Sequence, residues 1–144
     1  MASPDVKGIL SSLLGEMAVP EPAYREALTV HRPKLQRAYA DYFKRERVEA
    51  AIYPTTPLPA ANIGEDETTM LNGAAVPTFA TFIRNTGPGS VAGIPGLSLA
   101  AGLTPAGLPV GMELDAPEGS DRRLLALGCA IEALLPKLPP PRLD

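Results

Sequence analysis

Apolar side chains recur with helical spacing in the first third of the chain. Between Pro4 and Leu14 they repeat every three or four residues, which predicts a short amphipathic helix that Gly15 would end. From Ala23 the helical spacing resumes, and Pro33 either kinks one long helix or begins a second one. The apolar stripe of this later stretch consists of Leu35, Tyr39, Tyr42 and Phe43.

The middle of the chain contains a short apolar run followed by polar segments with prolines. Residues 48–53, VEAAIY, predict a strand that the Pro-Thr-Thr-Pro sequence at 54–57 stops. Residues 58–69 predict a loop with an acidic centre. Residues 70–84 are ambiguous, because a glycine and a proline within them argue against one uninterrupted helix. The side chains that would form a helical apolar face here are Phe79, Phe82 and Ile83.

The segment 85–111 is 27 residues long and carries no charged side chain, but it contains seven glycines and four prolines. Such composition predicts buried strands joined by tight turns. The strands would be GLSLAAG at 96–102 and GLPVGMEL at 107–114, with a turn at 104–107 between them. The sequence Gly-Pro-Gly-Ser at 87–90 lacks the Gly-Lys-Ser/Thr of a phosphate-binding loop, so it predicts a glycine turn.

A final helix is predicted after Ser120, which suits the N-cap position, and Pro136 would end it. Helices and three predicted strands together indicate an α/β fold in one domain over residues 1–135. A proline-rich, extended tail over 136–144 would follow. A sheet of three strands is thin, so its edges would expose unpaired backbone groups. The apolar face of the final helix consists of Leu124, Leu127, Gly128, Ile131 and Leu135.

Composition and charge exclude several classes of protein. The net charge is −3 over 144 residues, which argues against nucleic-acid binding. No stretch reaches the roughly 18 apolar residues of a membrane span, and the first residues do not resemble a signal peptide. The single cysteine, Cys129, cannot form an internal disulfide and is predicted to be a small buried side chain. These features favour a cytoplasmic protein.

Candidate catalytic groups are scarce. The one histidine, His31, lies in a helical stretch beside Arg32 and is expected at the surface. Without further His or Cys ligands no ordinary zinc site can form, and no GxSxG motif indicates a serine hydrolase of the α/β type. The sequence therefore predicts no metal and no cofactor.

Three segments, in order, resemble the amidase signature family. They are Asn85 with GIPGLSLAAG at 93–102 and GLPVGMEL at 107–114, the stretch QRAYADYFKRERVEAAIYPTTPLPA at 36–60, and residues 118–135. The resemblance covers roughly residues 30–135 and is closest to the mandelamide and indoleacetamide hydrolase branch. It implies the C-terminal part of the amidase signature fold: a few core strands of a mixed sheet packed by helices, incomplete on its own.

The resemblance also implies a reaction whose catalytic residues this chain lacks. The family hydrolyses a carboxamide to a carboxylate and ammonia with a Ser, a second Ser in a cis peptide and a Lys. Its serines lie in a glycine-rich loop that has no counterpart here. Lys7 and Ser90 echo the family's order, but Lys7 falls in a predicted amphipathic helix and Ser90 has no double-serine context. No catalytic residue is therefore assigned, and the chain alone is expected to be inactive.

Other residues correspond by position to the family's substrate side. The resemblance implies that Thr55 and Thr56 lie near the pocket mouth, and that Met70, Phe79 and Asn85 lie near a bound substrate. Alternatives from the residues themselves stay open, since Phe79 could belong to the core and the two threonines could cap the strand end. Asn85 could hold an αL backbone or reach a ligand.

Three roles are consistent with this sequence. The first is the C-terminal portion of an amidase that shapes the pocket for a small amide. The second is a non-enzymatic subunit or interaction module that completes a separately encoded amidase, and the third is a fragment without a selected function. In each case we expect the chain to bind a missing N-terminal catalytic portion or to self-associate.

Overall fold

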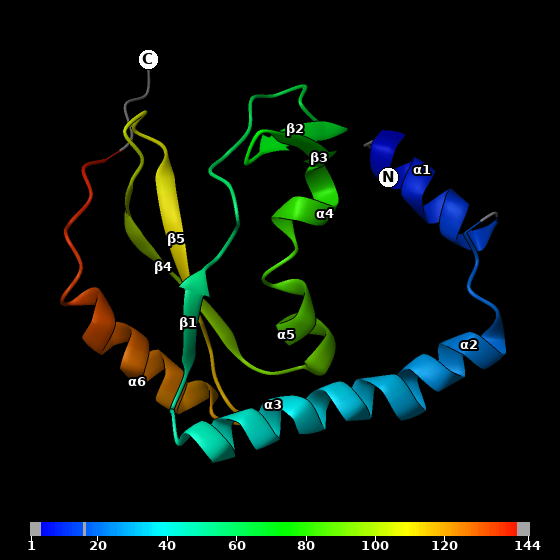
Figure 1. The fold of residues 1–144 in the computed structure, drawn as a ribbon, viewed down its shortest axis with the longest axis horizontal. Coiled ribbons are helices and arrows are strands. Elements are labelled where there is room, and N and C mark those ends of the chain that lie inside the picture. Colours follow the sequence, from blue (N-terminus) through cyan, green and yellow to red (C-terminus); the bar gives the residue numbers. More distant parts are fainter. Residues whose placement is uncertain (1–3, 16, 141–144) are drawn as a thin grey trace. The chain divides into compact units, whose positions relative to one another are not determined.

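A computed structural model describes residues 4–15 and 17–140, in which a helical first part is followed by groups of strands and helices (Figure 1). The chain divides into two compact units, the first ending at Leu35 and the second beginning at Gln36. The elements are α1 (Pro4–Leu14), α2 (Glu21–Glu26), the π-helical turn η1 (Ala27–His31), α3 (Arg32–Glu46), β1 (Ala51–Pro54), β2 (Thr68–Leu71), β3 (Ala74–Pro77), α4 (Thr78–Phe82), α5 (Gly87–Ala92), β4 (Gly96–Leu103), β5 (Pro109–Asp115) and α6 (Asp121–Glu132).

The first unit is helical, as its apolar spacing predicts. The predicted helix over residues 4–14 is confirmed as α1. Near Pro33 the backbone is continuously helical. Helix α2 ends at Glu26, the π-helical turn η1 follows directly, and α3 begins at Arg32. Because Pro33 has no N–H and crowds the carbonyl one turn before it, an ordinary α-helical turn is disfavoured there. The wider π-helical turn precedes the proline, so the helical backbone is modified and not broken.

The second unit is built on a three-stranded antiparallel sheet in the order β1-β5-β4. The predicted strands at 96–102 and 107–114 are confirmed as β4 and β5, which pair across the predicted turn and lie side by side in Figure 1. The α/β fold is thereby confirmed, and helices pack on the strands. Within the described residues, no helix is long and apolar enough to cross a membrane.

The core of this unit lies between the sheet and α6. Leu114, Ala116 and Leu124 are buried there, with Leu97 packed against them. Gly128 lets α6 approach β4 closely, because a Cβ atom at this position would lie 2.3 Å from Leu97 Cδ2. The predicted apolar face of the last helix therefore packs as expected, although the helix ends at Glu132 and does not reach residue 135.

Several predicted boundaries in the middle of the chain are wrong. The strand predicted at 48–53 begins only at Ala51, because α3 continues to Glu46 and Arg47 then takes a positive φ of 54°. The loop predicted up to Thr69 already contains the start of β2. The ambiguous segment 70–84 forms the antiparallel hairpin β2–β3 and then α4. The turn of this hairpin is Asn72-Gly73, whose φ values of 50° and 81° suit a tight two-residue connection.

The uncharged segment also differs from its prediction in two ways. Residues 87–92 form the short helix α5 and not a glycine turn. The strands are less buried than predicted: β4 alternates between exposed and half-buried residues, and only the last residues of β5 are buried. An apolar run indicates that a strand is suited to burial, but other parts of a fold must cover it.

Two side chains near and within α6 depart from expectation. Ser120 makes no side-chain cap bond to the helix, because its hydroxyl donates instead to the carbonyl of Pro117 at 2.5 Å. Cys129 is exposed and not buried, since it lies off the face that contains Leu124 and Gly128.

Candidate polar site on the sheet

One face of the three-stranded sheet carries a cluster of polar side chains. Side chains alternate between the two faces of a strand, so Glu113 and Asp115 of β5 share the face opposite to Leu114. Tyr53 of β1 is registered with Glu113, and Ser98 of β4 is registered with Glu113 from the other side. Together with Thr55, these residues form what we call the polar cluster.

The strongest contact in the polar cluster joins two strands. The Tyr53 hydroxyl donates to Asp115 Oδ2 at 2.5 Å, and Asp115 is only 3% exposed. A Cβ atom at Gly89 would lie 2.7 Å from the same Oδ2, so the glycine of α5 leaves room for this carboxylate. Burial raises the pKa of Tyr53, and the negative charge of Asp115 raises it further. Tyr53 therefore stays a hydrogen-bond donor.

A second contact links β4 to the residue that follows β1. The hydroxyls of Thr55 and Ser98 lie 2.5 Å apart. The Thr55 backbone N–H also donates to the carbonyl of Gly111 at 3.0 Å, which extends the β1–β5 ladder by one residue. Burial raises the pKa of the neighbouring Glu113 carboxyl, with a smaller contribution from the charge of Asp115, and a hydrogen bond from Thr55 opposes the shift. The surroundings of Glu113 thus favour its protonated form more than water does.

The raised pKa of Glu113 predicts a pH dependence of stability. Its ordinary pKa is 4.5 and its folded value is higher, so its contribution is fully present below 4.5 and is lost as pH rises through the folded value. We expect Glu113→Gln to remove this loss, so that the variant gains stability relative to the parent chain as pH increases from about 4 to about 8. Urea unfolding across this range measures the difference, and the exposed Glu67→Gln is the matched control. A constant difference between parent and Glu113→Gln would contradict the prediction.

Asn85 ties the end of β1 to the segment before α5. Its side-chain Nδ2 donates to the carbonyl of Pro54 at 2.7 Å. Positive φ among the described non-glycine residues occurs at Arg47 and Asn72, so the alternative that Asn85 holds an αL backbone is wrong. A cavity of about 440 Å³ adjoins this bond. It is lined by Tyr39, Tyr53, Pro54, Arg84 and Asn85.

The structure brings together only some of the residues predicted to contact substrate. Thr55, a member of the polar cluster, follows the end of β1, and Asn85 reaches the same place through its bond to Pro54. The residue after Thr55 is Thr56, whose hydroxyl donates to the carbonyl of Leu58 at 2.6 Å. This is a local hydrogen bond of the kind expected if the threonine caps the strand end. Met70 on β2 is 60% exposed, and Phe79 on α4 is 72% exposed, so Phe79 does not lie in the core that this chain forms by itself. A substrate role for these five residues stays a prediction.

Sequence reasoning missed the acidic half of the polar cluster. Glu113 and Asp115 are two residues apart on a predicted strand, which places both on one face. Two buried carboxyls on one face of a sheet are unusual, since charged groups are seldom buried unless paired. Their spacing of two residues on a predicted strand was the signal from which this acidic pair could have been found. Their partner Tyr53, 62 residues away from Asp115, could not be identified without the tertiary structure.

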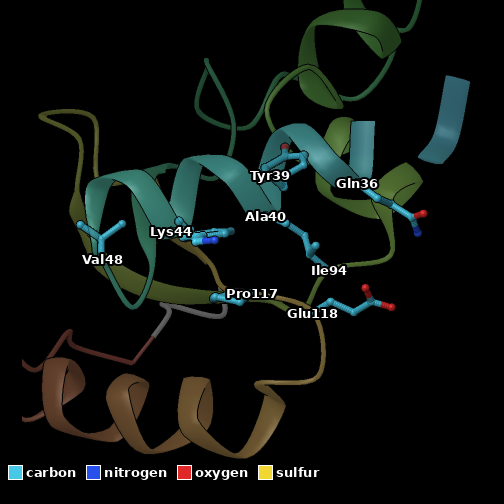
Figure 2. Close-up of a pocket in the computed structure, with 9 residues that line it drawn as sticks. Gln36, Tyr39, Ala40, Lys44, Val48, Ile94, Pro117 and Glu118 are labelled. Carbon is cyan, nitrogen blue, oxygen red and sulfur yellow. The ribbon is translucent and has the colours of Figure 1, made fainter. Parts of the chain in front are cut away.

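A second cavity, of about 410 Å³, lies along α3 (Figure 2). Figure 2 shows Gln36, Tyr39, Ala40 and Lys44 of this helix opposite Ile94 and the turn that contains Pro117 and Glu118, with Phe43 and Val48 completing the lining. Gln36 Nε2 donates to the carbonyl of Ala92 at 2.9 Å and so joins α3 to α5. None of the predicted substrate residues lines this cavity.

The remaining candidate groups are exposed. Lys7 lies on α1 in the first unit, and Ser90 lies on α5 in the second. His31 is exposed, with Nε2 3.7 Å from a carboxylate oxygen of Glu26. Among residues 4–15 and 17–140, no group of three His, Cys, Asp or Glu side chains is arranged to hold a metal ion.

Comparison with known proteins gives one consistent result. Residues 9–125 match the family model described as Amidase. The chain is 48% identical to an indoleacetamide hydrolase of Agrobacterium vitis over 130 residues, covering 90% of this chain and 28% of that protein. It is 40% identical to a mandelamide hydrolase of Pseudomonas putida, covering 98% of this chain and 29% of that protein. A crystal structure of an amidase superposes with a TM-score of 0.80 at 33% identity, covering 93% of this chain and 29% of that one. This chain thus spans less than a third of the length of these relatives.

Proposed function

Because this chain belongs to the amidase family, we propose that it forms the C-terminal, pocket-shaping portion of an amide hydrolase. The observation that supports this role best is the meeting of Asn85 and Thr55 at the end of β1. Asn85 donates to Pro54 and lines the cavity of about 440 Å³ with it, while Thr55, the residue after Pro54, contacts Ser98. Asn85 and the end of β1 thus form a polar rim of the cavity that Tyr39 and Tyr53 also line.

The polar rim suits an amide that carries an aromatic group. Tyr39 and Tyr53 contribute aromatic side chains to the cavity lining, and the bond from Asn85 Nδ2 to Pro54 leaves the Asn85 Oδ1 atom as an acceptor for an amide N–H. The names of the relatives, indoleacetamide hydrolase and mandelamide hydrolase, are those of enzymes acting on such amides. Water would cleave the C–N bond, giving a carboxylate and ammonia. In this proposal the chain binds and orients the substrate, while serines and a lysine outside it perform the chemistry.

The proposal predicts no amide hydrolysis by the 144-residue chain alone. Incubated with indoleacetamide, the purified chain should release no ammonia above a buffer control, because no serine of this chain lies in a glycine-rich double-serine loop. Co-expression with the N-terminal portion of the Agrobacterium vitis relative should restore ammonia release. In that complex, Asn85→Ala should lower kcat/KM about tenfold or more, since one oriented hydrogen bond is lost, whereas the exposed Asn62→Ala should not. Turnover by the chain alone that Ser90→Ala abolishes would disprove the assignment.

A non-enzymatic subunit that completes a separately encoded amidase is the second candidate. The observation that favours it is the number of large apolar side chains that the described residues expose. They include Ile52 on β1, Met70 on β2 and Phe79 on α4, all more than half exposed. Exposed apolar surface of this kind marks interaction sites. Both candidates require a partner, either the missing catalytic portion or another copy of this chain.

A further inference from the structure

The ring of Tyr53 is held at both of its ends. Its backbone belongs to β1, where Tyr53 is registered with Glu113 of the central strand β5. Its hydroxyl donates to Asp115 Oδ2 at 2.5 Å, and Asp115 is the diagonal neighbour, two residues further along β5. A side chain that is anchored both at its Cα atom and at its terminal oxygen loses most of its freedom to change rotamer. The ring of Tyr53 therefore has a fixed position in the folded chain.

The carboxylate that anchors this hydroxyl is itself enclosed. Asp115 is only 3% exposed. A Cβ atom at Gly89 of α5 would lie 2.7 Å from its Oδ2 atom, and a Cβ atom at Gly96 of β4 would lie 3.0 Å from its Oδ1 atom. Each carboxylate oxygen thus has a glycine beside it, one from a helix and one from a strand. A larger side chain at either glycine would displace the carboxylate, so both glycines preserve the anchor of the Tyr53 ring.

Tyr53 also lines the cavity of about 440 Å³ that Asn85 borders, which we call the tyrosine cavity. The second aromatic side chain in its lining is Tyr39 of α3. Burial raises the pKa of Tyr39, and the negative charge of Asp115 raises it further, as it does at Tyr53. Both phenols thus stay uncharged, so an uncharged aromatic group can pack in the tyrosine cavity without meeting a phenolate.

We propose that Asp115 is a positioning residue of the tyrosine cavity, which holds the ring of Tyr53 where the aromatic group of an amide packs. This inference rests on the proposed function. Asp115 is not among the described residues that line the cavity, so it acts through Tyr53 and does not touch the ligand. Binding is tighter when a contacting side chain is already ordered, because its rotamer freedom is not lost on binding. The Tyr53 hydroxyl is committed to Asp115, which leaves recognition of the amide group to Asn85.

Substitutions of Asp115 test this role through ligand binding to the 144-residue chain. The chain has no tryptophan, so the indole fluorescence of indoleacetamide reports its binding directly. Asp115→Ala removes the acceptor for the Tyr53 hydroxyl, and we expect about threefold to tenfold weaker binding. Asp115→Asn also removes the charge but keeps an acceptor oxygen, so its dissociation constant should stay within about twofold of that of the parent chain. A fluorescence anisotropy titration measures these constants.

A second pair of substitutions reaches Asp115 from α5. Gly89→Ala places a Cβ atom 2.7 Å from Asp115 Oδ2 and should weaken indoleacetamide binding about as much as Asp115→Ala does. Gly87→Ala is the matched control on the same helix, because its Cβ atom would meet no other atom within 4 Å, and it should leave binding unchanged. Circular dichroism melts establish that each variant is folded at the temperature of the titration. If Asp115→Ala does not fold, the two glycine variants provide the comparison.

The outcomes separate a positioning role from a purely structural one. Equal weakening by Asp115→Asn and Asp115→Ala would show that the charge matters and not the acceptor, and this result would overturn the inference alone. Unchanged binding in Asp115→Ala or Gly89→Ala would overturn it too, because the ring would then need no anchor. A parent chain that does not bind indoleacetamide would overturn both the inference and the proposed aromatic specificity. Asp115-dependent binding, in a chain whose complex with the N-terminal portion of the Agrobacterium vitis relative releases no ammonia, would contradict the proposed function and leave the positioning role intact.

Discussion

Leu114→Ala should lower the free energy of unfolding of the second unit by about 3 kcal/mol, within the range of about 2 to 5 kcal/mol for buried leucines. Leu114 is 2% exposed and lies in the core cluster with Ala116 and Leu124. It belongs to the central strand, which is held by β1 on one side and β4 on the other. Because the paired strands restrict collapse, a cavity would remain where the side chain was removed. Urea unfolding followed by circular dichroism measures the loss.

The matched control for this experiment is Leu125→Ala. Leu125 is 59% exposed on α6, so the same deletion should change stability by less than about 1 kcal/mol. If Leu114→Ala does not fold, Leu114→Val gives a smaller loss of about 1 kcal/mol that can still be measured. Equal effects at the two leucines would show that the core does not lie between β5 and α6.

Tyr53→Phe should cost about 2 kcal/mol of stability, which is typical of a lost hydrogen bond to a charged group. The ring remains, but the hydroxyl that donates to the buried Asp115 is removed. The carboxylate then stays in a poorly hydrated position without this donor. Tyr42→Phe on α3 is the matched control, because Tyr42 is 38% exposed and its hydroxyl makes no such buried bond among the described residues. Thermal and urea unfolding of both variants at neutral pH provide the comparison.

A double-mutant cycle assigns the cause of the Tyr53→Phe loss. In an Asp115→Asn background the acceptor is uncharged, so the cost of Tyr53→Phe should fall by about half or more. An unchanged cost would mean that the hydroxyl stabilises the fold through another contact.

Local sequence pattern predicted the elements whose signals lie close together along the chain. Helix α1, the β4–β5 pair and the face of α6 all follow from apolar spacing and turn residues. The β2–β3 hairpin was not predicted, although Asn72-Gly73 is a strong turn signal, because its four-residue strands show little alternation. The glycines at 87–93 suggested a turn, but residues 87–92 form a helix in which Gly89 lies close to the Asp115 carboxylate.

The candidate site depends on contacts between distant residues. Asn85 reaches Pro54 across 31 positions, and Thr55 reaches Ser98 across 43. The family resemblance indicated Asn85 and Thr55 as substrate-side residues. It did not indicate that the Asn85 side chain would donate to the carbonyl of Pro54 at the end of β1. Met70 and Phe79 came from the same resemblance, but they lie on the hairpin and α4 and do not line the cavity that Asn85 lines. Proximity of this kind is not encoded by spacing along the chain.

The sequence by itself determined the α/β class, the uncharged strands, the family resemblance and the absence of the family's serine loop from this chain. These properties depend on residue type and on spacing over a few positions, which propensity and periodicity report directly. Only the tertiary structure decided that Glu113, Asp115 and Tyr53 share one polar face, and that Asn85 reaches the carbonyl of Pro54 at the end of β1. Those features follow from strand order and register, because pairing brings backbone groups and side chains together whatever their distance in the sequence.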